Sequence, residues 1–259
     1  MNIPIITEII ENKKEAEDIR TISFYFSEKI IPGQFLMIWI PNVDEIPMSV
    51  SYNNREIKGI TFRKVGEATS ALYDLKKGEK IGIRGPYGNG FSLKGKHILF
   101  VGGGTGIATL APAVEEAIKK DIKSTVIIGV KNKSELFFEK RFNECGANVV
   151  VSTNDGSAGK KGLASEIAKK ILQKEKIDSV ITCGPELMMK TLLNYSNGIS
   201  LQASLERYIK CAIGICGQCC IGEGLRVCVE GPVFDGNSLK NIEDFGVYKR
   251  DAAGIKITY

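Results

Sequence analysis

The stretch HILFVGGGTGIATLAPAVEEAIKK (residues 97–120) combines an apolar run of strand length, a glycine-rich turn and a helix-like pattern. Three more strand-like runs follow, each before a helix-like run: STVIIGV with SELFFEKRFNEC, ANVVVST with LASEIAKKILQKE, and DSVITCG with ELMMKTLLNYS. Repeated units of this kind join parallel strands and place helices on both faces of their sheet. The sequence therefore predicts a parallel-sheet α/β domain over residues 96–199.

The residues before this domain have a different pattern. Short alternating or β-branched runs, among them IRTISFYF, GQFLMIWI, PMSVSY and IKGITFRKV, are separated by turn signals such as Pro32-Gly33 and Asn53-Asn54. One helix-like run, EATSALYDLKK, interrupts them. Closely spaced strands with a single short helix are typical of an antiparallel barrel, which we expect over residues 1–95.

The regular pattern ends near residue 200, where cysteines and glycines dominate. A segment with so little periodic hydrophobicity does not form a core of its own without a stabilising element such as a disulfide or a bound metal. The predicted fold is thus a multi-domain β plus α/β architecture, with a small C-terminal domain over residues 200–259.

Composition excludes several classes of function. The chain has 259 residues and a net charge of +5, and its lysines alternate with acidic residues instead of forming a basic stripe. This argues against nucleic-acid binding. The N-terminal MNIPIITEIIENKKEAED meets charges too early for a signal peptide or membrane anchor, so we expect a cytoplasmic protein without a membrane span. In a reducing compartment, clustered cysteines more often hold metal than form disulfides.

Five of the seven cysteines lie in CAIGICGQCCIGEGLRVC, residues 211–228. Cys211, Cys216, Cys219 and Cys228 have the spacing C-x4-C-x2-C-x8-C, and the first three match the plant-type pattern for a 2Fe–2S cluster. Glycines in the loop let backbone amides turn toward the sulfurs. A zinc site, a disulfide cluster and simple buried cysteines are the alternatives. Cys220 could replace Cys219 as a ligand, but the spacing favours Cys219.

The glycine-rich turn lies where open parallel sheets bind ligands, at the carboxyl end of the first strand. Its glycines allow close approach of a ligand, and the helix that follows favours a phosphate group at its N-terminus. The candidate nucleotide-binding residues are Gly103, Gly104, Thr105 and Gly106. A strict G-x-G-x-x-G is absent, so a purely structural tight turn is the alternative.

Cys183 and Gly184 lie at the equivalent end of the fourth strand. The Cys183 thiol either faces a nicotinamide ring or is a packed small residue. The second strand ends at GVKNKS without an acidic residue for a ribose 2′-hydroxyl, and Lys131 and Lys133 there also suit a 2′-phosphate. The sequence thus does not distinguish NAD from NADP.

Taken together, PMSVSY, FRKVGEAT, GPYGNGF, GGGTGIATLAP and TCGPELMM resemble the ferredoxin reductase-like flavoproteins. In that superfamily an N-terminal barrel holds FAD and an α/β domain holds the nicotinamide nucleotide. The C-terminal SLERYIKCAIGICGQCCIG with RVCVEGPVF is similar to the electron-transfer subunits of NAD-linked (type B) dihydroorotate dehydrogenase. The resemblance covers essentially the whole chain and implies a 2Fe–2S domain after the nucleotide domain.

The resemblance also implies the FAD contacts. The superfamily's R-P-x-S motif falls on Ile46-Pro47-Met48-Ser49, so its arginine is missing here, and Arg63 or Arg55 is expected to compensate. The fourth cysteine also follows the third more closely than in the relatives. The implied FAD-binding residues are Pro47, Met48, Ser49, Thr61, Phe62, Arg63, Ala68 and Thr69.

The function that the resemblance implies is electron transfer between a partner and a nicotinamide nucleotide. An FMN-containing dihydroorotate dehydrogenase catalytic subunit, in a heterotetramer of two of each chain, would oxidise dihydroorotate to orotate for pyrimidine biosynthesis. Electrons would then pass through the 2Fe–2S cluster and FAD to NAD. No residue of this chain is expected to act as a general base or nucleophile, and His97, the one histidine, is expected to have a packing role.

Two alternatives stay open at this point. One is a diaphorase subunit of another complex, such as a hydrogenase, a sulfur reductase, a glutamate-synthase-like complex or an NADPH:ferredoxin-type oxidoreductase. The other is a non-enzymatic redox sensor that uses the cysteine site.

Overall fold

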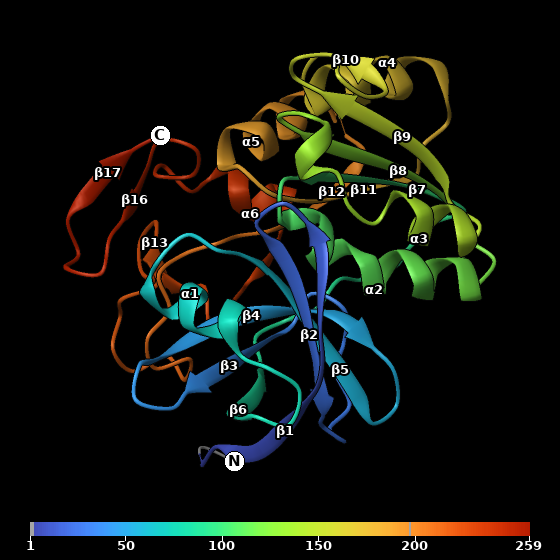
Figure 1. The fold of residues 1–259 in the computed structure, drawn as a ribbon. Helices are drawn as coiled ribbons and strands as arrows, with labels where there is room; N and C mark the ends of the chain where they lie inside the picture. Colours follow the sequence, from blue (N-terminus) through green and yellow to red (C-terminus); the bar gives the residue numbers. More distant parts are fainter. Residues whose placement is uncertain (1–2, 197) are drawn as a thin grey trace.

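The computed structural model describes residues 3–196 and 198–259. Its N-terminal part is a closed antiparallel barrel with the strand order β1-β2-β5-β4-β3-β6 (Figure 1). The strands are β1 (Ile5–Ala16), β2 (Ile19–Tyr25), β3 (Phe35–Ile40), β4 (Asp44–Asn53), β5 (Ile57–Arg63) and β6 (Lys80–Tyr87). Helix α1 (Glu67–Asp74) lies between β5 and β6 and ends three residues before the predicted limit. The predicted barrel is confirmed.

The barrel closes because alternate side chains of its strands are apolar and point inward. Ile22 and Phe24 of β2, Leu36 and Ile38 of β3, and Ile60 of β5 are fully buried in one cluster. Leu72 is the buried residue of α1, and it packs this helix against the same cluster.

The second part is a seven-stranded sheet with the order β10-β9-β8-β7-β11-β12-β15. Strands β7 (His97–Gly103), β8 (Lys123–Val130), β9 (Asn148–Thr153), β10 (Lys160–Lys161), β11 (Ser179–Cys183) and β12 (Ser200–Ser204) are parallel. The helices are α2 (Gly106–Lys119), α3 (Glu139–Glu144), α4 (Ala164–Lys174) and α5 (Glu186–Tyr195), and a short 3-10 turn η1 (Lys133–Glu135) follows β8. The four strand-then-helix units are confirmed.

Alternate residues of the central strands face opposite layers of helices (Figure 1). Leu99 and Val101 of β7 pack in the cluster that includes α4 and α5, whereas Ile98 and Phe100 pack in the cluster that includes α2 and α3. Both faces of the sheet are therefore covered, as the continuous apolar runs of these strands require.

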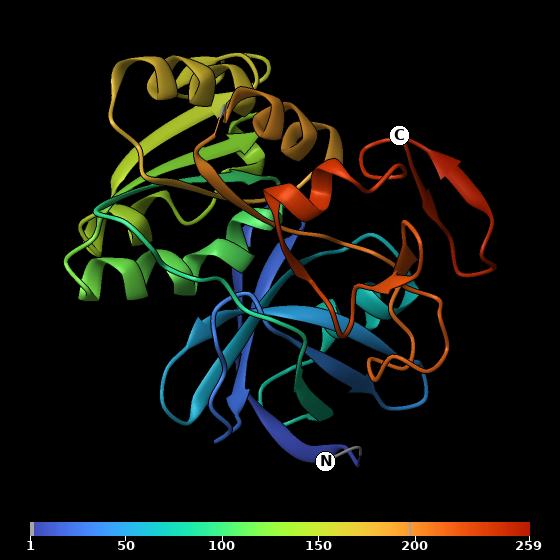
Figure 2. The same cartoon turned by 180° about the vertical axis from the view of Figure 1, so that it is seen from behind.

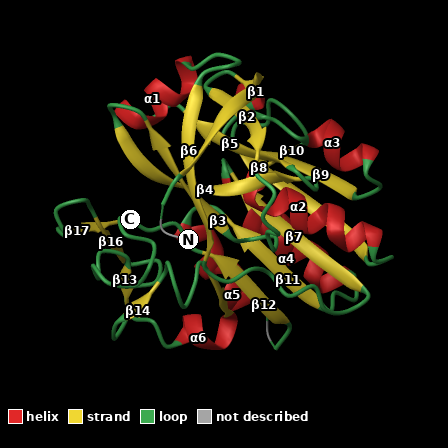
Figure 3. Cartoon of the chain, turned by 90° about the horizontal axis from the view of Figure 1, so that it is seen from below, coloured by secondary structure: helices red, strands yellow, loops and turns green. Residues whose placement is uncertain are grey.

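The C-terminal part is joined to this sheet more closely than expected. The predicted boundary at residue 200 falls on the first residue of β12, which pairs with β11, and β15 (Val233–Asp235) then pairs antiparallel with β12. The remaining elements are β13 (Cys220–Ile221), β14 (Leu225–Arg226), α6 (Gly236–Lys240), β16 (Tyr248–Arg250) and β17 (Lys256–Thr258). Figures 2 and 3 show that the β13–β14 and β16–β17 hairpins lie on the side of the molecule away from α2 and α3.

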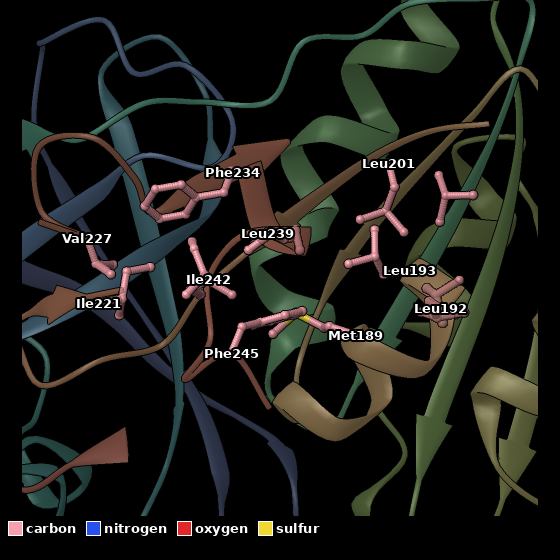
Figure 4. Packing of buried hydrophobic residues seen from close by; sticks show 14 of the residues in the cluster. Met189, Leu192, Leu193, Leu201, Ile221, Val227, Phe234, Leu239, Ile242 and Phe245 are labelled. Atoms are coloured by element: carbon pink, nitrogen blue, oxygen red, sulfur yellow. The ribbon is translucent and has the colours of Figure 1, made fainter. Parts of the chain in front are cut away.

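The apolar residues of this part pack into the core of the α/β domain. Figure 4 shows Phe245 beside Met189 of α5, and Ile221 near Ile242. These four residues and Phe234 are buried in one cluster. The C-terminal segment thus shares the hydrophobic core of the α/β domain and has no separate core. This explains why its own sequence has so little periodic hydrophobicity.

Candidate functional site

The barrel encloses one side of a cavity of about 440 Å³, here called the barrel cavity. Its wall contains residues of β3, β4, β5 and α1, the start of α2, and the segment after β12. Seven of the eight predicted FAD-binding residues line it: Pro47, Met48, Ser49, Thr61, Phe62, Arg63 and Thr69. The eighth, Ala68, packs against the barrel core instead.

Hydrogen bonds fix the wall of the barrel cavity. The Thr61 hydroxyl lies 2.8 Å from that of Thr21 and donates to Ser51 Oγ at 2.7 Å, which ties β5 to β2 and β4. The Thr69 hydroxyl accepts from the backbone N–H groups of Val65 and Gly66, both at 2.9 Å. These bonds order the turn that begins α1, where the resemblance places a pyrophosphate.

The structure also tests what replaces the missing arginine at Ile46. Arg55 is exposed and does not line the cavity, whereas Arg63 does. A third arginine, Arg207, lines the cavity as well and was not predicted. Both Arg63 and Arg207 are held by carboxylates, because Arg63 Nη1 lies 2.8 Å from Glu135 Oε1 and Arg207 Nη2 lies 2.9 Å from Glu186 Oε1.

A larger cavity of about 810 Å³, here called the sheet cavity, lies at the carboxyl ends of the parallel strands. Gly103, Gly104 and Thr105 reach it from the turn after β7, and Gly184 reaches it from the turn after β11. Residues from the ends of β8 and β9 complete this edge, among them Lys131 and Asn154. Open parallel sheets bind nucleotides at this place.

At two positions in these turns, neighbouring backbone atoms lie too close to allow any residue with a Cβ atom. A Cβ on Gly106 would lie 2.4 Å from the Cys183 carbonyl oxygen, and Gly184 has a φ of +143° with the Gly103 carbonyl 2.7 Å from where its Cβ would stand. Gly104, in contrast, faces open space. Gly106 therefore packs the α2 turn against β11, and Gly103 makes room for the side chains of Pro185 and Met188, whereas Gly104 leaves room for a ligand.

Cys183 is 1% exposed and lines neither cavity. Burial raises the pKa of its thiol to about 12, so the thiol stays protonated. Of the two readings of the sequence, this geometry favours the packed small residue. His97 begins β7, at the opposite end from the glycine turn, and its Nε2 lies 3.0 Å from the Thr125 hydroxyl.

Sequence reasoning missed the three carboxylates that line the sheet cavity, which are Glu135, Glu186 and Glu206. Glu135 follows β8 in η1 and ion-pairs with Arg63, whose hydrogen bond lowers the pKa of the Glu135 carboxyl. Glu206 lines both cavities. Its side chain is open to solvent, yet protein surrounds it closely enough that burial raises the pKa of its carboxyl.

The four candidate cluster ligands lie as two pairs. The Cys216 N–H lies 3.5 Å from Cys211 Sγ, and the Cys219 and Cys228 side chains contact each other. Within the part of the chain that the structure describes, no three potential metal ligands converge on one point. Two pairs are what a 2Fe–2S cluster requires, because each of its irons takes two protein ligands.

The loop chemistry also fits a cluster. Burial acts to raise the pKa of the Cys211 thiol, but backbone N–H groups of Cys216, Ile213 and Ile215 lower it to about 6. Thiolates are the form that binds metal. Cys219 is 2% exposed, whereas the adjacent Cys220 is partly exposed and its sulfur lies 3.9 Å from the Gly224 carbonyl oxygen.

Comparison with known proteins agrees with this geometry. The family model for the iron–sulfur cluster binding domain of dihydroorotate dehydrogenase B matches residues 206–240, and the model for an oxidoreductase NAD-binding domain matches residues 100–193. A chain of Methanocaldococcus jannaschii, named probable dihydroorotate dehydrogenase B (NAD(+)), electron transfer subunit, is 46% identical over 262 residues, covering 100% of both chains. This chain belongs to the dihydroorotate dehydrogenase B electron transfer subunit family.

A second member of the family, from Methanothermobacter thermautotrophicus, is 42% identical and covers 100% of this chain and 99% of its own. Among solved structures, an NADH-dependent reduced ferredoxin-NADP oxidoreductase matches with a TM-score of 0.82 at 29% identity, covering 92% of this chain and 90% of the other. A phthalate dioxygenase reductase shares the fold, with a TM-score of 0.62 at 19% identity over 75% of this chain and 64% of the other. The predicted family and fold are confirmed.

The family assignment also confirms the predicted class of chemistry. The chain is an oxidoreductase electron-transfer subunit with an iron–sulfur domain and an NAD-binding domain. The term subunit implies a catalytic partner. None of the described helices is both long and apolar enough to cross a membrane.

Proposed function

We propose that this chain passes electrons from a dihydroorotate-oxidising subunit to NAD, with a 2Fe–2S cluster in the cysteine loop and FAD in the barrel cavity. The observation that carries the proposal is one short segment. Leu205, Glu206, Arg207 and Ile209 line the barrel cavity, and the chain then enters the cysteine loop at Cys211. A flavin exchanges electrons singly or as hydride, so it links one-electron and two-electron carriers.

The residues of the chain divide this task. The residues of β4 and β5 that line the barrel cavity would hold and orient the flavin, while the turns after β7 and β11 would leave space for the nucleotide. Cys211 and Cys216 would hold one iron, and Cys219 and Cys228 the other. We infer that Cys220 is not a ligand.

The surface of the cysteine loop supports a partner at this place. Ile213, Ile215, Leu225 and Val229 are at least one third exposed, and Ile215 reaches 80%. Such a group of exposed apolar side chains is typical of a protein interface. We propose that this surface binds an FMN-containing catalytic subunit, in a complex of two copies of each chain.

Anaerobic affinity purification of the chain from its own cells tests the function. We expect flavin and iron–sulfur absorbance, a co-purifying subunit that oxidises dihydroorotate, and a complex mass that corresponds to two of each chain. Orotate formation that proceeds equally well without this chain would contradict the proposal.

A second candidate is electron transfer within a different complex. The fold match to an NADH-dependent reduced ferredoxin-NADP oxidoreductase favours it, because that structure covers almost the whole chain. Identification of the co-purifying subunit separates the two candidates. Ferredoxin-linked NADP reduction without dihydroorotate oxidation would establish the second.

A further inference from the structure

Arg141, on helix α3 of the α/β domain, lies between that domain and the barrel. Its Nη2 donates to the Ser51 carbonyl oxygen of β4 at 2.9 Å, and its Nε donates to Glu115 Oε1 of α2 at 2.7 Å. A guanidinium can make two such bonds in different directions, because its N–H groups form a rigid planar fork. One side chain therefore joins a barrel strand to a helix of the nucleotide-binding domain.

Two aromatic rings contact the same guanidinium. Its central carbon lies 3.6 Å from the centre of the Tyr52 ring on β4 and 4.6 Å from that of the Phe138 ring, which precedes α3. The two rings also contact each other edge to face, with their centres 5.6 Å apart. The Arg141 side chain is only 14% exposed, and removal from water strengthens the attraction between a cation and an aromatic face.

The backbone before α3 brings Arg141 to this place. Phe138, the N-cap residue of α3, has a φ of +64°, in the left-handed region that bulky residues rarely adopt. Phe138 is buried, and its ring also packs against those of Phe137 and Phe142, at centre distances of 4.8 and 6.2 Å. Strain of this kind persists only where the surrounding structure holds it. The aromatic packing thus fixes the turn that directs the first turn of α3, with Arg141, toward the barrel.

Each element that Arg141 holds leads to one of the two cavities. On β4, Ser49 lines the barrel cavity and lies two residues before Ser51. On the other side, α2 begins after Thr105, which lines both cavities, and Glu115 lies about 15 Å further along this helix. Arg141 itself lines neither cavity. Its bonds therefore fix the direction of α2 relative to β4 at a point away from any bound group.

We propose that Arg141 is a positioning residue, which holds the nucleotide-binding domain at the angle to the barrel at which the nicotinamide meets the flavin. This inference rests on the proposed function, with the flavin in the barrel cavity and the nucleotide in the sheet cavity. Hydride passes only between atoms that are nearly in contact, and a displacement of about 1 Å caused by a remote substitution can slow such a step by roughly 100-fold.

Rapid mixing of the anaerobically purified complex with NADH tests the proposal. In Arg141→Gln we expect flavin reduction at saturating NADH to slow by roughly 10- to 100-fold, while the half-saturating NADH concentration changes by no more than a few-fold. The absorbance band of a nicotinamide stacked on the flavin should weaken as well, and this band reports contact and not turnover. Arg141→Lys keeps the charge but not the planar fork, so it should recover part of both the rate and the band.

Lys140→Gln is the matched control, because Lys140 is the neighbouring residue of α3, is 88% exposed and pairs with Glu144 on the surface. It should retain the wild-type rate and band. An Arg141→Gln protein with the wild-type rate and band, or equal losses in the two variants, would overturn the proposal. A higher half-saturating NADH concentration with an unchanged limiting rate would also overturn it, because Arg141 would then act in nucleotide binding.

Tyr52→Leu decides the question if Arg141→Gln does not fold. This change removes a ring from the guanidinium but leaves no charge unpaired, since the two hydrogen bonds of Arg141 involve other residues. We expect flavin reduction to slow by a few-fold in Tyr52→Leu and to keep the wild-type rate in Tyr52→Phe, which retains the ring. Equal rates in all three proteins would overturn the proposal. Wild-type protein that binds no flavin, or whose flavin is not reduced by NADH, would instead overturn the proposed function.

Discussion

Arg63 at the end of strand β5 and Glu135 in the turn after β8 form an ion pair of 2.8 Å between the barrel and the α/β domain. Arg63 lines both cavities, and Glu135 lines the sheet cavity. The arginine that would balance the charge of a bound FAD therefore already has a carboxylate partner in the same protein.

Removing Arg63 should weaken flavin binding, whereas removing the charge of Glu135 should not. Arg63→Gln should weaken FAD binding by about 10-fold, the value of a charge-assisted hydrogen bond to phosphate. Glu135→Gln releases the guanidinium and should leave FAD affinity equal or higher. Fluorescence titration of flavin-free protein measures both. Equal loss in the two variants would show that the ion pair orders the cavity instead of competing for Arg63.

The same ion pair predicts an acid-dependent stability. The Arg63 hydrogen bond lowers the pKa of Glu135 in the folded chain, so the contribution is complete above the unfolded pKa of about 4.3 and is lost as pH falls through the lower folded value. Both side chains are partly exposed, which limits the contribution to about 1 kcal/mol or less. We expect Glu135→Gln to reduce the loss of unfolding free energy between pH 5 and about pH 3, measured by urea denaturation. An unchanged acid profile would contradict this prediction.

Adjacent cysteines provide a matched test of the cluster ligands. Cys219 is 2% exposed and contacts Cys228, whereas the Cys220 sulfur faces Gly224. Cys219→Ser should abolish the cluster absorbance and partner-linked transfer, while dye reduction by NADH persists. Cys220→Ser should retain all three. Loss of the cluster in Cys220→Ser, with the cluster retained in Cys219→Ser, would show that Cys220 and not Cys219 is the third ligand.

The buried pair of Glu186 and Arg207 should contribute strongly to folding. Their side chains are 3% and 4% exposed, and Arg207 Nη1 also donates to the Tyr248 carbonyl at 2.9 Å, which ties the β16–β17 hairpin to α5. Arg207→Met leaves a buried carboxylate unpaired and should lower the unfolding free energy by about 3–5 kcal/mol. The exposed pair of Lys120 and Glu116 provides the control, because Lys120→Met should cost about 0.5 kcal/mol or less.

Glu186→Gln combined with Arg207→Met tests the reason for that loss. The double variant removes the unpaired charge and should recover part of the stability relative to Arg207→Met alone. Urea denaturation of the four proteins completes the cycle. A double variant that is less stable than Arg207→Met would show that packing, and not the unpaired charge, dominates.

The sequence predicted the elements that repeat and missed those that depend on distant pairing. Four strand-then-helix units were recognisable because each has a strong local pattern. Strand β15 has only three residues, and it forms because Ala203 and Phe234 come into register across the whole cysteine segment. No local sequence pattern predicts a pairing between two strands that are so far apart in the chain.

The candidate site shows the same division. Glycines and cysteines have motif spacing, so they could be predicted, and so could the flavin residues through the resemblance. Glu135 and Glu206 lie in segments without a motif, and their positions depend on where η1 and the end of β12 meet the barrel. The available signal for Glu135 was its place five residues after the second strand, directly after the GVKNKS stretch, which itself contains no acidic residue.

The pairing of β12 with β15 has a consequence for electron transfer. The cysteine segment leaves the sheet after Ser204 and returns to it at Val233, directly opposite, since these two residues are partners in the ladder. A cluster bound by this segment would therefore be carried by a loop that is joined to the sheet at both ends, instead of by a module attached through a single linker. We expect the two attachments to limit changes in the distance between the cluster and the barrel cavity, so a partner subunit would have to approach the cysteine loop.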